Sequence, residues 1–198
     1  MFDWLKNINK EHPPFWKNYL ESFANKTQRY VVFSCESSGH NITKDVLFSV
    51  GGIGIIDEMI VVKDGFEVVM LQYRYLHDNG LSNDFILVSK IEKMTEYDGL
   101  KSFIEYISNA VLVGHRTQYD IDMINEALEQ RMDCGRLRNE ALDIEIMFNK
   151  VKDTYEKKYS LQEMCDYFQI PISERNSAMD DAYTIGLLFI KLKNKLGI

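Results

Sequence analysis

The order of its hydrophobic segments constrains the fold of this chain more than any other feature of the sequence. Apolar, β-favouring runs occupy residues 30–33, 46–56 and 61–72, and a further short run lies at 111–114. Most of the remaining second half has the apolar spacing of helices instead. Strands that come early and helices that come late predict an α/β domain with a mixed central sheet flanked by helices.

The helical segments can be placed from their apolar spacing and their boundary residues. The pattern predicts helices over about 97–107, 119–130, 160–168 and 177–195. No internal repeat, low-complexity segment or linker divides this part of the sequence. Residues 29–198 are therefore expected to form one domain.

An amphipathic helix is predicted before the first strand. Prolines stand at the likely first turn of the segment 13–25, and apolar residues follow near helical spacing: Phe15, Trp16, Tyr19, Leu20 and Phe23. Core packing is the favoured interpretation, and docking of a protein partner is the alternative. We expect residues 1–28 to form a helical extension packed on the domain.

Composition limits the class of protein. The chain has 198 residues, of which 45% are hydrophobic and 27% charged, as in ordinary globular domains. It has neither the apolar run of about 18 residues that spans a bilayer nor the apolar stretch of a signal peptide. Cys35, Cys134 and Cys165 are too few and too far apart for a disulfide framework or a zinc pattern. We therefore expect a cytoplasmic protein with no membrane association.

The net charge bears on nucleic-acid binding without deciding it. A value of −7 argues against a broad electrostatic grip on duplex DNA, which needs dense Lys and Arg surfaces. A negative net charge is less of an obstacle for an enzyme whose bound metal ions contact the phosphate, because there the protein supplies the carboxylates that hold the metal. Both options stay open.

Three acidic residues stand where separate elements meet. Glu36 follows the first strand, Asp120 follows the run at 111–114, and Asp181 lies near the start of the last helix. Metal-assisted phosphodiester hydrolysis needs carboxylates from different elements that converge on one point. An isolated acidic residue is far more often solvated, so the surrounding motifs have to decide.

These motifs, in this order, resemble those of the DEDDh-type 3′-5′ exonucleases over about residues 30–192, most closely the DNA polymerase III epsilon-like branch with its ribonuclease H-like fold. Residues 31–39 are similar to an apolar strand followed by Asp-x-Glu-Thr-Thr-Gly, with Glu36 at the Glu position. Residues 111–120 are similar to a strand, Gly-His-Asn and an aromatic-Asp pair, with Asp120 at the second Asp. Residues 175–182 are similar to Arg-His-x-Ala-x-x-Asp-Ala, with Asp181 at the last Asp.

Two connecting segments support the resemblance. Leu142 and Asp143 are similar to the family's Leu-Asp-Thr, and residues 159–162 are similar to the Tyr-Ser-Leu that starts its next helix. Asp143 is more simply interpreted as a helix N-cap.

The sequence departs from the family at three positions. Ser34 stands where the family has its first Asp, which bridges two metal ions. Asn176 stands where the family has the His that takes a proton from the attacking water. Arg116 replaces the usual Asn. It is interpreted either as a positive charge that partly replaces a missing metal or contacts a phosphate, or equally well as an exposed surface residue.

By the resemblance, Glu36, Asp120 and Asp181 inherit metal-binding roles, and Ser34 and Asn176 occupy catalytic positions that have lost their chemistry. The implied cofactor is Mg²⁺ or Mn²⁺ with reduced occupancy, because a neutral hydroxyl cannot bridge two hard cations. The implied partner is a single-stranded nucleic-acid 3′ end. The residues expected to contact it are Ser37, Ser38, His115 and Arg116.

Two functions follow from this pattern. The first is a 3′-5′ exonuclease whose metal-dependent hydrolysis is weakened or lost, with Asp180 or His115 as substitute groups. The alternative is a non-catalytic pseudo-exonuclease that binds nucleic-acid ends or a protein partner. A purely structural role is less favoured, since burying three carboxylates without a metal or a partner is costly.

Overall fold

A six-stranded sheet forms the centre of the molecule, and a computed structural model describes residues 12–72, 91–172 and 177–198 of the chain. The strand order is β4-β3-β2-β1-β5-β6. The strands are β1 (Tyr30–Ser37), β2 (Leu47–Ile56), β3 (Met59–Leu71), β4 (Lys93–Thr95), β5 (Val111–Gly114) and β6 (Ala141–Asp143).

Both strand directions occur in this sheet. β1, β2 and β3 form an antiparallel meander, whereas β5 pairs with β1, β6 with β5, and β4 with β3 in parallel. Among these parallel pairs, β5 is connected to β6 through a helix, α5 (Thr117–Arg131), in the kind of crossover that parallel strands require. The mixed central sheet expected from the sequence is confirmed.

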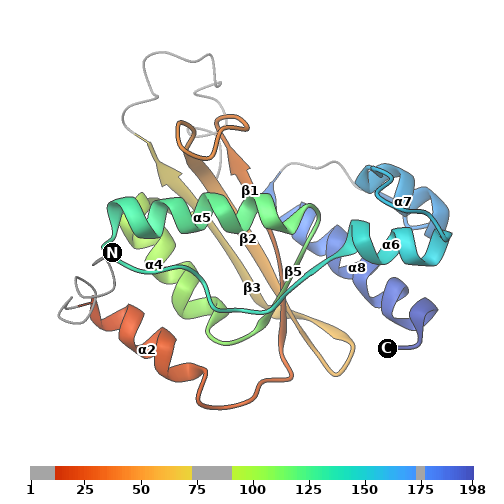
Figure 1. Cartoon of the computed structure of the whole chain (residues 1–198), viewed down its shortest axis with the longest axis horizontal. Helices are drawn as coiled ribbons and strands as arrows, with labels where there is room; N and C mark the ends of the chain where they lie inside the picture. The colour runs from red at the N-terminus through yellow and green to blue at the C-terminus, as the bar shows by residue number, and fades with distance from the viewer. Residues whose placement is uncertain (1–11, 73–90, 173–176) are drawn as a thin grey trace, which may run out of the picture.

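Helices cover both faces of the sheet (Figure 1). One face packs against α2 (Pro14–Ser22), α4 (Glu96–Ile107) and α5 (Thr117–Arg131). The other face packs against α6 (Ile144–Lys152), α7 (Leu161–Phe168) and α8 (Ala178–Leu196). Successive residues of β1 divide between these layers, since Val31 and Phe33 lie in the first core and Val32 in the second.

The N-terminal helix belongs to the first core. Phe15, Trp16 and Tyr19 of α2 are buried there, and Tyr19 Oη donates a hydrogen bond of 2.7 Å to Asn139. The apolar face of α2 is therefore used within the chain, as the core-packing interpretation predicts. Any partner would have to meet the opposite face of this helix.

Gly51 lets α8 approach the sheet closely. A Cβ atom at this position would overlap the backbone of Ala178 and Met179 at the start of α8. Gly51 also lies opposite Ser34 in the pairing of β1 with β2. The glycine thus brings the first turn of α8 directly against the strand that carries Ser34 and Glu36.

The elements predicted from the sequence are all present, with boundaries that differ by at most two residues, except that β1 continues to Ser37 and α2 ends at Ser22, three residues before its predicted end. Apolar spacing predicted no range for three further elements: β4, β6 and α6. The first two are only three residues long, too short to establish an alternating pattern. In the described part of the chain, no helix is long and apolar enough to cross a membrane.

Candidate active site

A pocket of about 710 Å³ lies where β1, the start of α5 and the start of α8 meet. Its lining includes eight of the nine site residues expected from the sequence: Ser34, Glu36, Ser37, Ser38, His115, Arg116, Asp120 and Asp181. The ninth, Asn176, lies outside the described residues. Asp180 is described but does not line this pocket.

The end of β1 and the turn after it position Ser34, Glu36, Ser37 and Ser38. β1 pairs regularly with β2 through Glu36, and the register shifts between Glu36 and Ser37. An irregularity of this kind bends a strand and redirects its side chains, so it separates Glu36 from the turn that follows. Ser38 Oγ then donates to Asp45 Oδ1 at 2.7 Å, which fixes the turn beside the pocket.

Asp120 is the most perturbed acid of the pocket. It is 9% exposed, and this burial is the main cause that raises its pKa to about 8. The backbone N–H of Cys35 donates to the carboxylate and acts in the opposite direction, while the charges of Glu36, Asp143 and Asp181 raise the pKa further. Three further carboxylates therefore lie within electrostatic reach of Asp120.

The same cluster affects the neighbouring thiol. Burial, together with the charges of Asp120 and Glu36, raises the pKa of Cys35 well above its usual value. A protonated thiol is a poor nucleophile and a poor metal ligand. Cys35 therefore adds bulk to the pocket wall but no reactive group.

The oxygen donors of Glu36, Asp120 and Asp181 suit Mg²⁺ or Mn²⁺ in kind. Their arrangement is a separate matter. Among residues 12–72, 91–172 and 177–198, no group of three or more His, Cys, Asp or Glu side chains is placed to hold a metal ion. The pocket thus has the donor chemistry for a hard cation without a preformed coordination shell.

Asp143 fixes the helix that carries Asp120. Arg116 precedes α5 with left-handed backbone angles (φ 57°, ψ 43°) and provides no side-chain cap. Asp143 Oδ2 instead accepts from the backbone N–H of Thr117 at 2.8 Å, and its Oδ1 accepts from Glu145 N–H at 2.8 Å. The predicted N-cap role of Asp143 is confirmed on α6, and the same carboxylate also caps α5.

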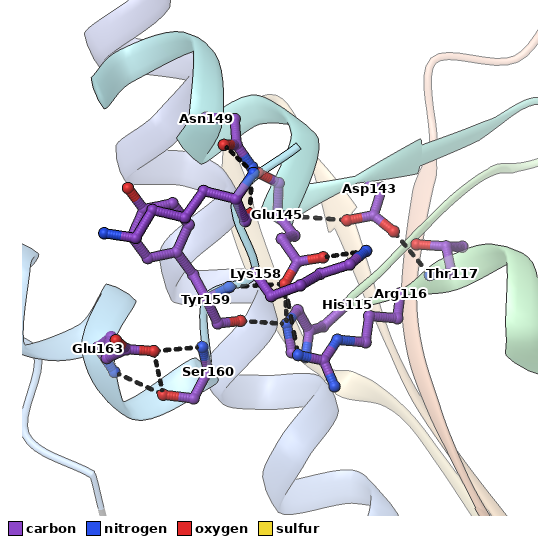
Figure 2. Close-up of polar contacts among 11 residues, drawn as sticks. His115, Arg116, Thr117, Asp143, Glu145, Asn149, Lys158, Tyr159, Ser160 and Glu163 are labelled. Carbon is purple, nitrogen blue, oxygen red and sulfur yellow. Dashed lines mark hydrogen bonds and ion pairs between the residues drawn. The ribbon is translucent and has the colours of Figure 1, made fainter. Parts of the chain in front are cut away.

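Glu145 gathers the basic groups beside the pocket (Figure 2). Its side chain is 7% exposed, and its Oε1 accepts from the backbone N–H of Tyr159 at 2.8 Å. Arg116 Nη2 lies 3.5 Å from Oε1, Lys158 Nζ lies 3.4 Å from Oε2, and His115 Nε2 lies 3.7 Å from Oε1. Burial opposes ionisation, but the hydrogen bonds and cations outweigh it and hold the pKa of Glu145 below its usual value.

The protonation of His115 follows from its contacts. Its Nε2 lies 2.9 Å from the carbonyl oxygen of Tyr159, which can only accept, so Nε2 carries a proton. Burial is the main cause that lowers the pKa of His115, and Arg116 adds to it. The neutral ring therefore has only Nδ1 left to accept a proton.

The pocket lining also contains two aromatic residues, Tyr119 and His40, that the sequence pattern did not single out. Tyr119 Oη donates to the carbonyl of Gly39 at 2.5 Å and lies 3.3 Å from Ser37 Oγ. The ring of His40 lies edge-on to Tyr119 at 6.0 Å. The aromatic residue that precedes Asp120 in the second motif was the available signal for Tyr119. Nothing in the sequence pattern marks Glu145, because its partners come from segments 14 and 29 residues away.

Comparison with known proteins places this geometry in a family. The RNase_T family model, which describes an exonuclease, matches residues 31–189. DNA polymerase III subunit epsilon of Buchnera aphidicola subsp. Acyrthosiphon pisum is 28% identical over 183 residues, covering 82% of this chain and 72% of the relative. A PolC-type DNA polymerase III of Caldanaerobacter subterraneus is 25% identical over 89% of this chain, but the chain spans only 12% of that protein.

A solved structure agrees with the fold. E. coli Exonuclease I in complex with a dT13 oligonucleotide superposes with a TM-score of 0.62 at 12% sequence identity, covering 86% of this chain and 42% of that one. The likeness supports the mixed sheet and its helical layers. With the family model matched over most of its length, the chain belongs to the RNase_T exonuclease family, of the DEDDh type.

Proposed function

We propose that this protein binds the 3′ end of a single-stranded nucleic acid in the pocket around Glu36, Asp120 and Asp181, and that metal-dependent hydrolysis there is weakened or lost. One observation carries the proposal: Ser34 lines the pocket beside three retained carboxylates, at the position where the family has an Asp. The class of ligand is supported by E. coli Exonuclease I, which is similar in fold and whose structure was solved in complex with a dT13 oligonucleotide.

The neutral Ser34 accounts for the weakened chemistry. Members of this family generally use divalent metals, and Glu36, Asp120 and Asp181 would hold such an ion here. The metal supplies charge stabilisation to the reacting phosphodiester when it is bound. A serine hydroxyl adds no negative charge to the cluster, so we expect reduced metal occupancy and at most one tightly bound ion.

Proton transfer is the second deficit. General-base catalysis contributes roughly 10²–10⁴-fold in rate, and the Asn176 side chain has no proton to exchange near neutral pH. Of the two substitute groups, His115 and Asp180, His115 lines the pocket, and its Nδ1 remains an acceptor. Its lowered pKa keeps it neutral at pH 7 but also makes it a weak base.

Non-catalytic binding is the second candidate function, and the basic rim favours it. Arg116 is 54% exposed at the pocket edge, and its Nη2 lies 3.5 Å from Glu145 Oε1, a long contact. A guanidinium in this position can contact a phosphate whether or not a metal is present. A protein partner remains part of this alternative. It would bind the outer face of α2, which lies within the proposed N-terminal extension of residues 1–28.

Binding and cutting can be tested separately. Fluorescence anisotropy would compare a linear single-stranded oligonucleotide with a circular one of the same sequence, which has no ends. We expect the linear strand to bind more tightly, and Arg116→Ala to remove most of the difference. Equal binding of both would contradict recognition of a 3′ end.

Cutting would be followed on a gel with Mn²⁺ for the unmodified chain, Ser34→Asp, Asn176→His and the double variant. We expect negligible digestion by the unmodified chain, little gain from either single change and a clear gain from both, because members of one catalytic unit act non-additively. Robust digestion by the unmodified chain that disappears in Asp181→Ala would make the protein a working exonuclease instead.

A further inference from the structure

A second pocket is lined by Glu145, the residue that contacts His115 and Arg116 of the candidate active site. Its volume is about 560 Å³, and its lining runs from α6 to the loop before α7. The lining includes Lys150, Lys157 and Lys158, together with the aromatic ring of Tyr155. None of these four residues was singled out in the sequence, and none of them lines the candidate active site.

Glu145, which lines the second pocket, also contacts Arg116 of the first. Lys158 of the second pocket and Arg116 of the first both reach this carboxylate, at 3.4 and 3.5 Å. Figure 2 shows the two side chains converging on Glu145 beside His115. Arg116 and Lys158 are therefore close neighbours, and a strand bound at Arg116 has Lys158 within reach.

Charge distinguishes this pocket from the protein as a whole. The chain has a net charge of −7, yet three lysines line one pocket with two acids, Glu145 and Glu156. Glu145 is already surrounded by cations and is 7% exposed, whereas the side chain of Lys158 is 76% exposed. Glu156 is exposed as well, so the surface that a ligand meets carries three positive charges against one exposed negative charge.

Two side chains of the pocket expose apolar surface that can pack against a nucleic-acid base. Tyr155 is 88% exposed and Ile146 is 61% exposed, and both line the pocket. Aromatic rings next to lysines are the combination by which proteins hold single-stranded nucleic acids, since bases stack on the ring and phosphates meet the cations.

The loop that carries these groups is held in place. The buried amide of Asn149 donates to the carbonyl oxygens of Glu145 and Lys157, and its Oδ1 accepts from Thr154 Oγ1 at 2.8 Å and from Lys157 N–H at 3.2 Å. Asp153 and Glu156 adopt left-handed backbone angles within the same loop. These contacts present Tyr155 and Lys157 from a fixed backbone.

We propose that the second pocket binds the segment of a single-stranded nucleic acid that lies upstream of the 3′ end held in the first pocket. The proposal rests on the proposed function, because the first pocket fixes the end from which the strand continues. A base stacks on Tyr155, and the phosphates on either side meet Lys150, Lys157 and Lys158.

The length of the oligonucleotide separates the two pockets in an experiment. A thymidine dinucleotide reaches only the first pocket, whereas a 12-nucleotide strand reaches both. Binding of each to the full chain would be measured by anisotropy or calorimetry over a range of salt concentrations. The variants are Lys150→Gln with Lys157→Gln, and separately Tyr155→Ala, which leave the contacts of Glu145 intact. Lys17→Gln with Lys26→Gln is the matched control, with the same change of charge in and after α2 on the other face of the sheet.

We expect dinucleotide affinity to stay the same in all of these variants. Tyr155→Ala should weaken binding of the longer strand by about fivefold or more, as loss of a stacked base does. The paired lysine variant should reduce the slope of log K against log salt by about 1.4, or roughly 0.7 for each phosphate that a lysine no longer neutralises. The control pair should bind like the unmodified chain.

Other outcomes separate the two ideas. If the dinucleotide binds in a way that depends on Arg116, but the longer strand binds equally to every pocket variant, only the second pocket is wrongly assigned. If neither oligonucleotide binds, both the proposed function and this inference are overturned. Saturable binding of an acidic peptide at Tyr155, with unchanged affinity for the 12-nucleotide strand, would assign the pocket to a protein segment and overturn the inference.

Discussion

The Asp143 carboxylate caps the helix that begins at Thr117, although 26 residues separate the two in sequence. Its other oxygen caps α6 through the N–H of Glu145. One side chain therefore fixes the starts of the helix that carries Asp120 and of the helix that carries Glu145. The first consequence is a prediction about stability.

Replacing Asp143 by Ala should destabilise the protein by about 2 kcal/mol, since each lost N-cap costs roughly 0.5–2 kcal/mol. For a chain of this size that corresponds to a decrease of about 4–8 °C in Tm, measurable by differential scanning fluorimetry. Asp143→Asn keeps one acceptor oxygen and should lose about half as much. An unchanged Tm in Asp143→Ala would show that neither helix depends on this cap.

Glu145→Gln should lower the free energy of unfolding at pH 7 by roughly 1.5–3 kcal/mol, the range for a hydrogen bond to a charged group. The pKa of Glu145 is depressed in the folded state, so its contribution is present above the unfolded pKa of about 4.3 and is lost as pH falls through the folded pKa. The difference between the two proteins should therefore shrink below about pH 4.

Urea unfolding at pH 7 and at low pH measures this difference. Glu129→Gln is the matched control, because it makes the same charge change in an exposed pair with Arg136. Such a pair should contribute about 1 kcal/mol or less. If Glu145→Gln lowered the free energy of unfolding no more than the control does, the buried carboxylate would not stabilise the fold beyond an ordinary surface pair.

The close approach at Gly51 predicts that adding a single methyl group there will destabilise the protein. Gly51→Ala would push the backbone of Ala178 and Met179, and with it the turn that carries Asp181, away from β2. We expect a loss of about 1–3 kcal/mol, as in other overpacked cores, in a urea titration. At Gly135 the nearest atom to an added Cβ is 3.6 Å away, so Gly135→Ala should change little. Equal stability of both variants would contradict the tight contact.

The sequence was sufficient for those parts of the fold and pocket that depend on local pattern. The long strands and helices could be predicted from apolar spacing. That Glu36, Asp120 and Asp181 line one pocket could be predicted because their motifs occur in the order of a known family. The contacts of Glu145 could not be predicted in this way, since they join α6 to Arg116 and to the loop at Tyr159. The role of Gly51 was equally hidden, because it depends on a helix more than 120 residues later.

The last prediction concerns the charge that Ser34 fails to supply. Ser34→Asp would add a carboxylate to a pocket that already contains Glu36, Asp120 and Asp181. In EDTA this added negative charge should lower Tm, because like charges then face one another without a cation. With Mn²⁺ present the order should reverse, since a fourth oxygen ligand strengthens the binding of a hard ion and bound metal stabilises the folded state. Ser34→Asn has nearly the shape of the Asp variant without its charge, and its Tm should not rise when Mn²⁺ is added.

Calorimetry should give at most one tightly bound Mn²⁺ in the unmodified chain and a higher affinity for Mn²⁺ in Ser34→Asp. Two tightly bound ions in the unmodified chain would mean that the pocket assembles its metal centre without the missing carboxylate, and the proposed loss of hydrolysis would then have to rest on Asn176 alone.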